Sequence, residues 1–406
     1  MRFILKIFFW FLKIIAAILL ILFTIVAIEY IICPVYNFPE PKAFQGEHLF
    51  NPYQDIDKPH WRRANFQVQS HAWGGVTNGR KNDNVIIDSV YQSLGYEVIA
   101  ISDYQKINNF GSEKPEYIPV YEHGYGVYKT HQVLIGAKRV TWTDYPLFQT
   151  LHNKQHIIDL LKENNELVYL AHPKIRDAYM AEDLKYLSGY TGVEVLNYFG
   201  LSPHHWDSAL SAGYPVTILG NDDAHDVSKP DEVGHRCTYI HSNSLHGDSI
   251  VEALRAGKAY GFDVKRHPDE PMDVKIAKAK TLPYLVYAKL KGDTLNVKIS
   301  GGVKHIVFKG QNGIVKAVVE GLNSAAYLFK ENDTYIRTEI LFYDLSVMYL
   351  NPVFRYDGND PWKQRSAEIN EYKTWLLRVL GFASIIFIIL NLVFIRRYFR
   401  RKRLNG

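Results

Sequence analysis

Cysteine is scarce in this sequence, and its scarcity excludes two common kinds of scaffold. The 406 residues include only Cys33 and Cys237, which cannot build a disulfide framework or a zinc–thiolate cluster. A strong excess of charge is also missing, because 47 Lys and Arg residues stand against 42 Asp and Glu residues, for a net charge of +5. Much of this excess lies in the C-terminal tail, so composition gives no reason to expect a nucleic acid as partner.

Both ends of the chain are apolar enough to predict a membrane span. Ile14–Ile28 is uncharged, and Ile7–Leu12 extends this run across Lys13, whose long side chain can reach the membrane surface. Val379–Ile395 also lacks charge, and Trp375 lies at its flank, where aromatic belts form. The first segment also fits a cleaved signal peptide, and the second fits a transmembrane helix best.

The flanking charges predict an orientation. Arg2, Lys6 and Lys13 precede or interrupt the first span, and six basic residues between 396 and 403 follow the second. Basic residues favour the cytoplasmic side of a membrane. We therefore expect both termini in the cytoplasm and residues from about 33 to 374 outside it, in a periplasmic or extracellular space.

Two patterns divide the chain between the spans. From residue 65, strand-like runs alternate with helical periodicity, which favours a parallel sheet or barrel with ligands at the carboxyl ends of its strands. After about residue 270 the helical patterns vanish, and short strands separated by Gly, Asn and Asp predict a β-sandwich. The expected division is a transmembrane segment (1–33), a linker or packing arm (34–64), a β/α region (65–268), a sandwich-like domain (269–358), a linker (359–374), a transmembrane helix (375–396) and a basic cytoplasmic tail (397–406).

Polar clusters with metal-binding side chains follow the predicted strands of the β/α region. Asp223 and His225 follow the run 214–219 at a spacing that points both side chains the same way on an extended segment. The candidate ligands from the residues alone are His71, Asp103, Glu122, His131, His172, Asp223 and His225. Imidazoles and carboxylates without thiolates suit zinc, manganese or iron, and a shared carboxylate can hold two such ions close together. Two ions can activate a water and clamp a phosphate.

Taken together, these motifs resemble the PHP (polymerase and histidinol phosphatase) superfamily. The resemblance covers roughly residues 65–261, including 253–261 as a closing helix. It rests on Gln69-Ser70-His71, Thr77-Asn78-Gly79, Ser102-Asp103-Tyr104, Glu122, His131, Ala171-His172-Pro173 and Asp223-Ala224-His225. It implies an α/β fold with a distorted seven-stranded β/α barrel, here followed by a small all-β domain and flanked by transmembrane helices.

The resemblance also implies metal positions, which this sequence fills unequally. The position formed by Glu122, His131 and His172 is complete, whereas its neighbour has Gln69 in place of a histidine. A third position departs further, with Asn78 and Tyr104. We expect two divalent ions, with a ligand set of His71, Glu122, His131, His172, Asp223, His225 and Gln69.

The remaining site residues follow from the same resemblance. His225, Tyr104 and Asp103 are expected to act in catalysis, with His225 or Tyr104 positioning the phosphate or protonating the leaving group. The residues expected around the metals or substrate are Glu194, Asp222, Asn78, Arg236 and His235. Glu194 fits either an acid near the metals or a partner of His172, and the second reading is favoured.

The predicted function is a membrane-anchored, extracytoplasmic, metal-dependent phosphoesterase that uses a metal-activated water on a small phosphoester. Some superfamily members with a similar β-rich tail are thought to cleave esters or amides, so the bond type stays open. The alternative is a catalytically decayed barrel that serves as a binding or scaffold module in an envelope complex. Gln69 and Tyr104 favour this alternative, and the complete Glu122, His131 and His172 set opposes it. A transporter is a weaker possibility, since two spans form no pathway without oligomerisation.

Overall fold

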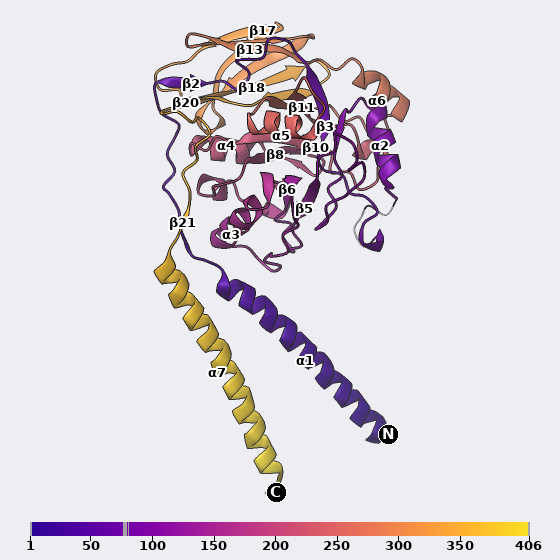
Figure 1. Ribbon diagram of the computed structural model, residues 1–406, viewed down its shortest axis with the longest axis vertical. Coiled ribbons are helices and arrows are strands. Elements are labelled where there is room, and N and C mark those ends of the chain that lie inside the picture. Colours follow the sequence, from indigo (N-terminus) through magenta and orange to yellow (C-terminus); the bar gives the residue numbers. More distant parts are fainter. Residues whose placement is uncertain (1, 76–78, 80, 405–406) are drawn as a thin grey trace.

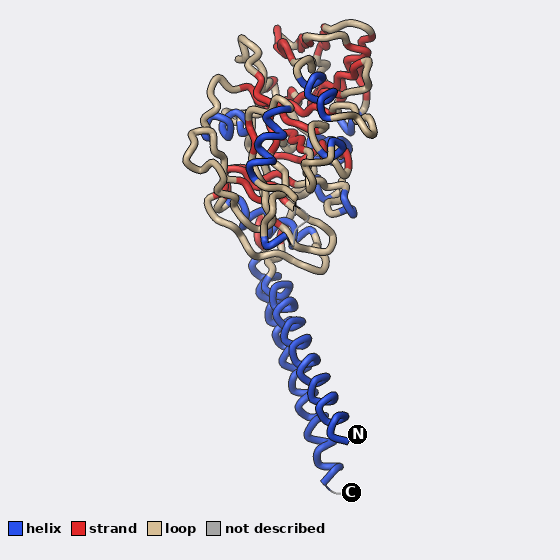
Figure 2. The backbone as a smooth tube through the Cα atoms, turned by 90° about the vertical axis from the view of Figure 1, so that its right-hand side faces the viewer, coloured by secondary structure: helices blue, strands red, loops and turns tan. Residues whose placement is uncertain are grey.

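Two long helices carry both termini away from a folded body in this computed structural model, which describes residues 2–75, 79 and 81–404 (Figure 1). They are α1 (Arg2–Ile32) and α7 (Glu371–Leu404), and they leave the same end of the body next to each other (Figure 2). Phe3–Ile32 and Glu371–Lys402 are long and apolar enough to cross a membrane. The two apolar ends predicted from the sequence are thus continuous helices.

The two helices are joined where they meet the body. Strand β1 (Tyr36–Asn37) pairs antiparallel with β21 (Glu368–Ile369). The Arg378 guanidinium donates to the carbonyl of Ile32 at the end of α1. Gly381 lets α7 approach α1 closely, because a Cβ there would lie 2.8 Å from side-chain atoms of Ile31. The two ends of the chain therefore enter the body as one unit.

A six-stranded sheet carries most of the predicted ligands. Its order is β10-β8-β7-β6-β5, with β9 paired to β8. These strands are β5 (Val120–His123), β6 (Gln132–Ala137), β7 (Asn165–Leu170), β8 (Gly192–Asn197), β9 (Gly200–Leu201) and β10 (Thr217–Asn221). Strands β7, β8 and β10 are parallel, as expected. The expectation of a parallel sheet is wrong for β5 and β6, because a hairpin loop rather than a helix joins them and β6 runs antiparallel to both neighbours.

A ten-stranded sheet spans both sides of residue 268. Its main path is β16-β15-β18-β19-β12-β11-β3-β4, and β2 and β20 extend it through β18. The strands are β2 (His48–Phe50), β3 (Trp61–Asn65), β4 (Val98–Ile99), β11 (Arg236–His241), β12 (Ala259–Asp263), β15 (Val303–Lys309), β16 (Val315–Glu320), β18 (Tyr335–Phe342), β19 (Val347–Leu350) and β20 (Val353–Tyr356). The β12–β19 pairing joins the β/α region to the C-terminal strands. A separate three-stranded sheet contains β13 (Leu285–Lys291), β14 (Thr294–Ile299) and β17 (Ser324–Leu328).

The described strands form no closed barrel, so that part of the expected fold is not confirmed. The six- and ten-stranded sheets pack against each other, but among the described residues no continuous ladder joins them, and isolated bridges pair Val68 with Ala224 and Tyr104 with Glu122. The ladder fails at the first junction because Asp223 takes a left-handed φ of +52° directly before Ala224. At the second junction, β4 has only two residues. A mixed α/β fold with several sheets is what the structure has.

Shorter helices pack against the strands of the body (Figure 1). They are α2 (Asn84–Ser93), α3 (Leu151–Lys162), α4 (Pro203–Ser211), α5 (Gly247–Arg255) and α6 (Met272–Ala279). Helix α3 begins at a capping box formed by Thr150 and Asn153. The predicted helix at 181–188 is only a 3-10 turn, Asp183–Lys185. The expected absence of helices after 270 is wrong, because α6 follows Pro271 and buries Lys275 against carbonyl oxygens.

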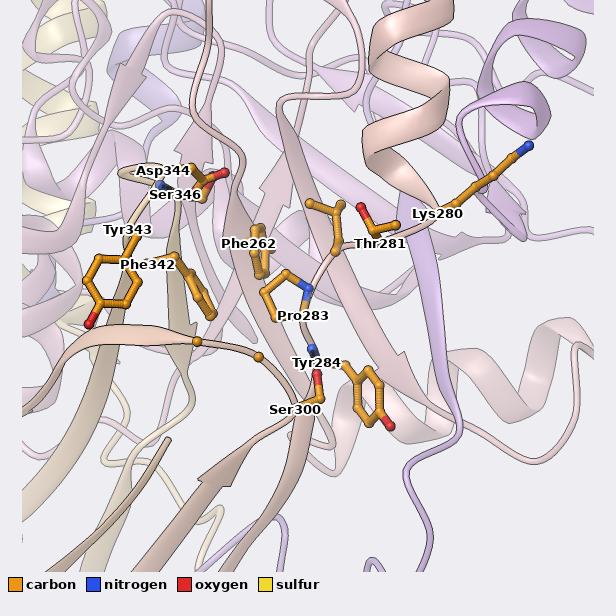
Figure 3. A pocket seen from close by; sticks show the side chains of 13 residues that line it. Phe262, Lys280, Thr281, Pro283, Tyr284, Ser300, Phe342, Tyr343, Asp344 and Ser346 are labelled. Carbon is orange, nitrogen blue, oxygen red and sulfur yellow. Dashed lines mark hydrogen bonds between the residues drawn. The ribbon is translucent and has the colours of Figure 1, made fainter. Parts of the chain in front are cut away.

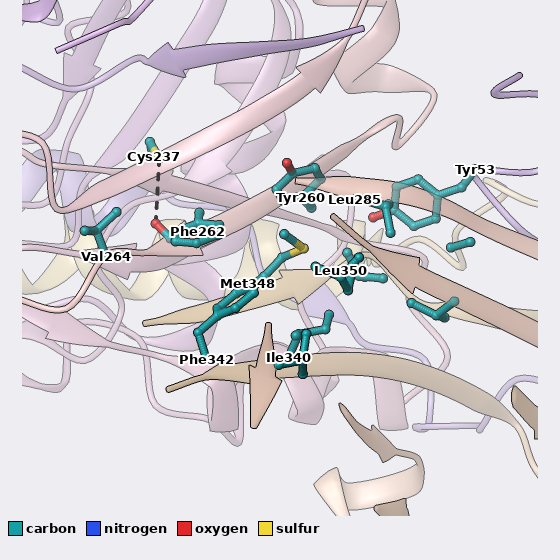
Figure 4. Packing of buried hydrophobic residues seen from close by; sticks show 14 of the residues in the cluster. Tyr53, Cys237, Tyr260, Phe262, Val264, Leu285, Ile340, Phe342, Met348 and Leu350 are labelled. Carbon is teal, nitrogen blue, oxygen red and sulfur yellow. Dashed lines mark hydrogen bonds between the residues drawn. The ribbon is translucent and has the colours of Figure 1, made fainter. Parts of the chain in front are cut away.

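One hydrophobic core joins the β/α region to the C-terminal strands (Figure 4). Tyr260 and Phe262 on β12 pack in the same cluster as Ile340, Met348 and Leu350, and all five side chains are buried. Burying a large apolar side chain contributes about 1.5–3 kcal/mol. The C-terminal strands therefore share a hydrophobic core with the β/α region and help to support it. The division into two domains at residue 268 stays a prediction.

Candidate metal centre

Three buried side chains converge where β5, β6 and β7 lie side by side. Glu122 belongs to β5, His131 directly precedes β6, and His172 follows β7 by two residues. One ligand atom from each lies within 4.8 Å of the others. Glu122 Oε1 is 2.5 Å from His131 Nδ1 and 3.3 Å from His172 Nε2. Neighbouring strands thus bring together three of the predicted ligands, which the sequence separates by up to fifty residues.

Two further side chains complete what we call the candidate centre, namely Gln69 and Asp223. Gln69 Nε2 donates to Glu122 Oε2 at 2.6 Å, and Asp223 Oδ2 accepts from Asn197 Nδ2 at 3.1 Å. The amide oxygen of Gln69, Oε1, and the second carboxylate oxygen of Asp223, Oδ1, are buried without a hydrogen-bond partner among the described residues.

His131 Nε2 and His172 Nδ1 are likewise buried without a described partner. A buried polar atom left unpaired costs about 1–3 kcal/mol. A divalent cation would use such atoms, and a donor set of imidazoles, carboxylates and one amide oxygen fits zinc, manganese or iron.

The backbone at the candidate centre is strained. His172 has a φ of +29° and Asp223 a φ of +52°, although neither is glycine. Such left-handed residues cost about 1–3 kcal/mol each and cluster at functional sites. Gly124 has a φ of +122°, and a Cβ there would lie 2.6 Å from His131 Cδ2. The ring of His131 therefore requires a glycine at position 124.

Three carboxylates surround the two imidazoles. Burial opposes charge on Glu122, but His131 and His172 beside it hold its pKa well below the usual range. Burial raises the pKa of Asp223 to about 6 and that of Glu194 to about 8. Burial would lower the pKa of His172, yet its hydrogen bond to Glu122 and the nearby carboxylates raise it to about 9. The group has more negative charge than its imidazoles balance, which suits a cation.

Glu194 on β8 holds the backbone around the candidate centre. Its Oε2 accepts from the His172 backbone N–H at 2.9 Å and from Asn197 Nδ2 at 3.0 Å, and its Oε1 accepts from Asn221 Nδ2 at 2.8 Å. Asn197 also donates to Asp223. Glu194 therefore binds the His172 backbone and also adds negative charge near the His172 ring.

Asp103 and His71 lie apart from the group of three. Asp103 is fully buried and accepts from the backbone and hydroxyl of Ser70, both at 2.9 Å, and from Asn108 Nδ2 at 2.8 Å. It thereby fixes the segment that carries Gln69. His71 is exposed and lines a hollow of about 340 Å³ together with Lys106 and Asn108.

Tyr104 and His225 lie beside the candidate centre. The Tyr104 ring is 5.4 Å from that of His131, and burial and the charge of Glu122 raise its pKa well above the ordinary value, so the phenol stays neutral. His225 Nδ1 donates to the Asp223 carbonyl at 2.8 Å, and its ring is 5.8 Å from that of Phe199. The Nε2 atom of neutral His225 is therefore the acceptor nitrogen.

The remaining predicted residues are engaged elsewhere. Asp222 accepts the backbone N–H groups of Gly234, His235 and Arg236 at 2.6, 2.8 and 2.8 Å, so it holds their loop. Arg236 forms an ion pair with Asp263, and His235 Nε2 lies 2.7 Å from Lys275 Nζ. Asn78 lies outside the described residues.

Lys129 is a residue that sequence reasoning missed. Its Nζ lies 5.7 Å from the centre of the Tyr104 ring, and its charge helps to lower the pKa of His131, after burial as the main cause. The signal available in the sequence was its place two residues before His131. Lys129 thus places a positively charged side chain at the edge of the candidate centre.

A hollow of about 540 Å³ lies in another part of the body (Figure 3). Three segments line it, among others: Lys280–Tyr284 between α6 and β13, Ser300–Gly302 between β14 and β15, and Phe342–Asp344 at the β18–β19 turn. Asp344 is its one carboxylate among the described lining residues, and none of them is a histidine. Its lining therefore lacks the donors found at the candidate centre.

Comparisons with known proteins do not identify a family for this chain. No family model matches the chain, and no curated protein matches it. A crystal structure of a two-domain protein containing a predicted PHP-like metal-dependent phosphoesterase, from Bacteroides vulgatus ATCC 8482, aligns with 82% of this chain and 99% of its own, at 13% identity and a TM-score of 0.39. A TM-score this low carries no argument about fold or function.

Proposed function

We propose that this chain is a membrane-anchored metal-dependent hydrolase that acts on phosphoesters outside the cytoplasm. The observation that carries the proposal is the buried group of Glu122, His131 and His172, whose ligand atoms lie within 4.8 Å of one another. The unpartnered atoms of Gln69 and Asp223 support it, because they extend the donor set. The apolar helices α1 and α7 support the anchoring, and the basic residues at both ends favour cytoplasmic termini.

In this proposal Glu122, His131 and His172 hold one divalent ion, and Glu122, Asp223 and Gln69 share in holding a second. When bound, the ions would polarise a phosphoryl oxygen and make water nucleophilic at neutral pH. Burial of the ligands excludes bulk water and so strengthens each electrostatic interaction there.

The surrounding residues would bind and protonate the substrate. Lys129 places a positive charge at the edge of the candidate centre, where a phosphoester is negative. The neutral phenol of Tyr104 can donate a hydrogen bond to a phosphate oxygen. His225, when protonated at Nε2, can give a proton to the leaving oxygen, because the Asp223 carbonyl fixes its other nitrogen as the donor within the chain.

The scaffold alternative keeps one specific observation in its favour. The amide of Gln69 donates directly to Glu122 Oε2, where the resemblance leads us to expect a histidine ligand. This hydrogen bond ties up one oxygen of the carboxylate that would bridge two ions. A chain that binds one ion for structure, with no turnover, would fit that arrangement.

Metal content and hydrolysis of an aryl phosphodiester test the proposal in one experiment. The full chain is purified in detergent without chelator, beside the double variant His131→Ala/His172→Ala. We expect about two ions per chain and turnover in the parent, and loss of both in the variant.

The matched control removes two exposed imidazoles, His48→Ala/His267→Ala, and should keep metal and activity. A parent that folds and binds no metal would sink the proposal. Bound metal without turnover on this substrate or on carboxylic esters and amides would favour the scaffold reading.

A further inference from the structure

Exposed aromatic and aliphatic side chains gather on two neighbouring loops beside the candidate centre. One loop is the β5–β6 hairpin loop, residues 124–131, and the other runs from 139 to 150. We call their exposed side chains the apolar rim: Tyr125, Val127, Tyr128, Trp142, Leu147 and Phe148. Each of them is between 47% and 58% exposed. Contiguous apolar surface of this kind marks a region that another phase or molecule covers.

The two loops of the apolar rim are bound to each other. Asp144 Oδ2 accepts the backbone N–H groups of Tyr125 and Gly126 at 2.8 and 3.1 Å. The backbone N–H of Val127 donates to the Pro146 carbonyl at 2.9 Å. These contacts make the rim one surface with a fixed shape.

One edge of the rim is attached to the end of α1. The Tyr30 hydroxyl accepts the backbone N–H groups of Leu147 and Phe148, both at 3.0 Å, and donates to the Phe148 carbonyl at 2.8 Å. The Tyr30 ring also packs on Tyr145 and Phe148, with centroids 5.2 and 4.9 Å away. Tyr30 lies in the last turn of the candidate span Phe3–Ile32, so the rim begins where that helix would leave a bilayer.

The other edge of the rim reaches the candidate centre. The hairpin loop connects the strand of Glu122 directly to His131. The Trp142 ring packs edge-on against Trp73 at 6.2 Å, and Trp73 Nε1 donates to the Tyr104 carbonyl at 2.7 Å. Packing contacts and hydrogen bonds therefore link the rim to the end of α1 on one side and to Tyr104, next to the candidate centre, on the other.

Basic side chains accompany the rim. Arg176 donates to the Val127 carbonyl at 2.6 Å, Lys129 lies in the hairpin loop itself, and Arg139 begins the second loop. Aromatic rings at headgroup depth with lysines and arginines around them are the composition that binds an anionic membrane surface.

We propose that the apolar rim lies in the headgroup layer of the membrane that α1 crosses, and that the candidate centre takes the phosphoester of a lipid headgroup. The substrate class rests on the proposed hydrolysis, whereas the membrane contact rests only on the proposed membrane span of α1. The hairpin loop that carries Tyr125, Val127 and Tyr128 ends at His131, so this arrangement would bring the headgroup layer close to the candidate centre.

Depth-dependent quenching tests the membrane contact. Tyr128→Cys is made in the full chain with Cys33→Ser, labelled with a fluorophore and placed in nanodiscs whose lipids carry bromine near the acyl carbonyl. The control label is Leu328→Cys on β17, which is 63% exposed and lies at the end of the body opposite the helices (Figure 1). We expect quenching at position 128 and none at 328. Equal fluorescence with and without bromine at position 128 overturns the membrane contact.

A matched pair of substrates tests the substrate class. Phosphatidylglycerol in nanodiscs is compared with its deacylated, water-soluble diester, using the parent and Tyr128→Ser/Phe148→Ser. We expect the variant to lose about tenfold or more on the lipid and less than about twofold on the soluble diester. Turnover of the soluble diester without any preference for the lipid overturns the lipid substrate while the proposed function stands. Turnover of neither by metal-loaded parent counts against the proposed function, and quenching still decides the membrane contact.

Discussion

Two buried clusters of charged residues differ in how completely their polar atoms are paired. Around Arg337, the Asp207 carboxylate accepts from both Nε and NH2 at 2.6 Å, and the Tyr335 hydroxyl donates to the same carboxylate at 3.0 Å. Glu339 then pairs with both Arg337 and Lys309. At the candidate centre, by contrast, Gln69, His131, His172 and Asp223 each keep a buried atom without a described partner.

This difference separates a structural cluster from a candidate functional one. The Arg337 cluster joins α4 to β18, and its charged groups pair with one another, so it gives no indication of a ligand. The candidate centre combines excess carboxylate, left-handed backbone at His172 and Asp223, and unused donors and acceptors. Stability alone explains the first arrangement. Without a bound cation, the unpaired buried atoms and the strained backbone of the second arrangement lower the free energy of unfolding, which indicates a functional role.

Breaking the structural cluster should give the largest loss of stability. Asp207→Ala leaves the Arg337 guanidinium, which is only 1% exposed, without its main partner. We expect the free energy of unfolding to fall by about 3–5 kcal/mol, measured by urea denaturation of the full chain in detergent. Metal content per folded chain should not change. A control on an exposed pair, Glu182→Gln opposite Lys185, should cost less than about 1 kcal/mol.

A side chain at position 124 should damage the candidate centre without damaging the fold. In Gly124→Ala the new Cβ would meet the His131 ring, and the φ of +122° disfavours any side chain. We expect metal affinity to fall about 10–100-fold, measured by competition with a chromogenic chelator. Gly111→Ala is the control, because its φ is also positive, at +76°, but its Cβ would find only Lys114 at 3.8 Å. Equal affinities in the two variants would remove His131 from the ligand set.

The same substitution should have opposite effects in the two clusters. Asp223→Asn removes a buried charge whose pKa is raised to about 6, keeps the contact with Asn197, and suits a left-handed φ. We expect the metal-free chain to gain about 2 kcal/mol and the metal-bound chain to lose affinity. Asp207→Asn should destabilise instead. Thermal unfolding with and without chelator measures both, and destabilisation of metal-free Asp223→Asn would contradict the distinction.

The sequence predicted the grouping of Glu122, His131 and His172 better than it predicted the fold around them. Glu122, His131 and His172 each follow or precede a short apolar run, and strand ends gather side chains at one edge of a sheet. The direction of β5 and β6 could not be read, because a short apolar run has the same pattern in a parallel or an antiparallel strand.

Long-range pairing could not be predicted either. Strand β12 pairs with β19 across more than eighty residues, and Arg337 meets Asp207 across 130. Neither partner carries a local signal for the other. The roles of Lys129 and Gly124 depend on how one hairpin loop folds back toward His131, which periodicity does not describe.

Metal binding should release a proton from the candidate centre. It should not change the protonation of the Arg337 cluster. In the metal-free chain the pKa of His172 is raised to about 9, so this imidazole is protonated at pH 7, whereas a metal binds only the neutral ring. Affinity should therefore rise about tenfold per pH unit as pH rises toward 9, then level off. The pKa of His131 is lowered, so that ring adds no proton at neutral pH. Titration calorimetry in buffers of different ionisation enthalpy measures the proton count. A metal affinity that does not change between pH 6 and 9 would show that His172 does not bind the metal. The two clusters would then not differ in proton release.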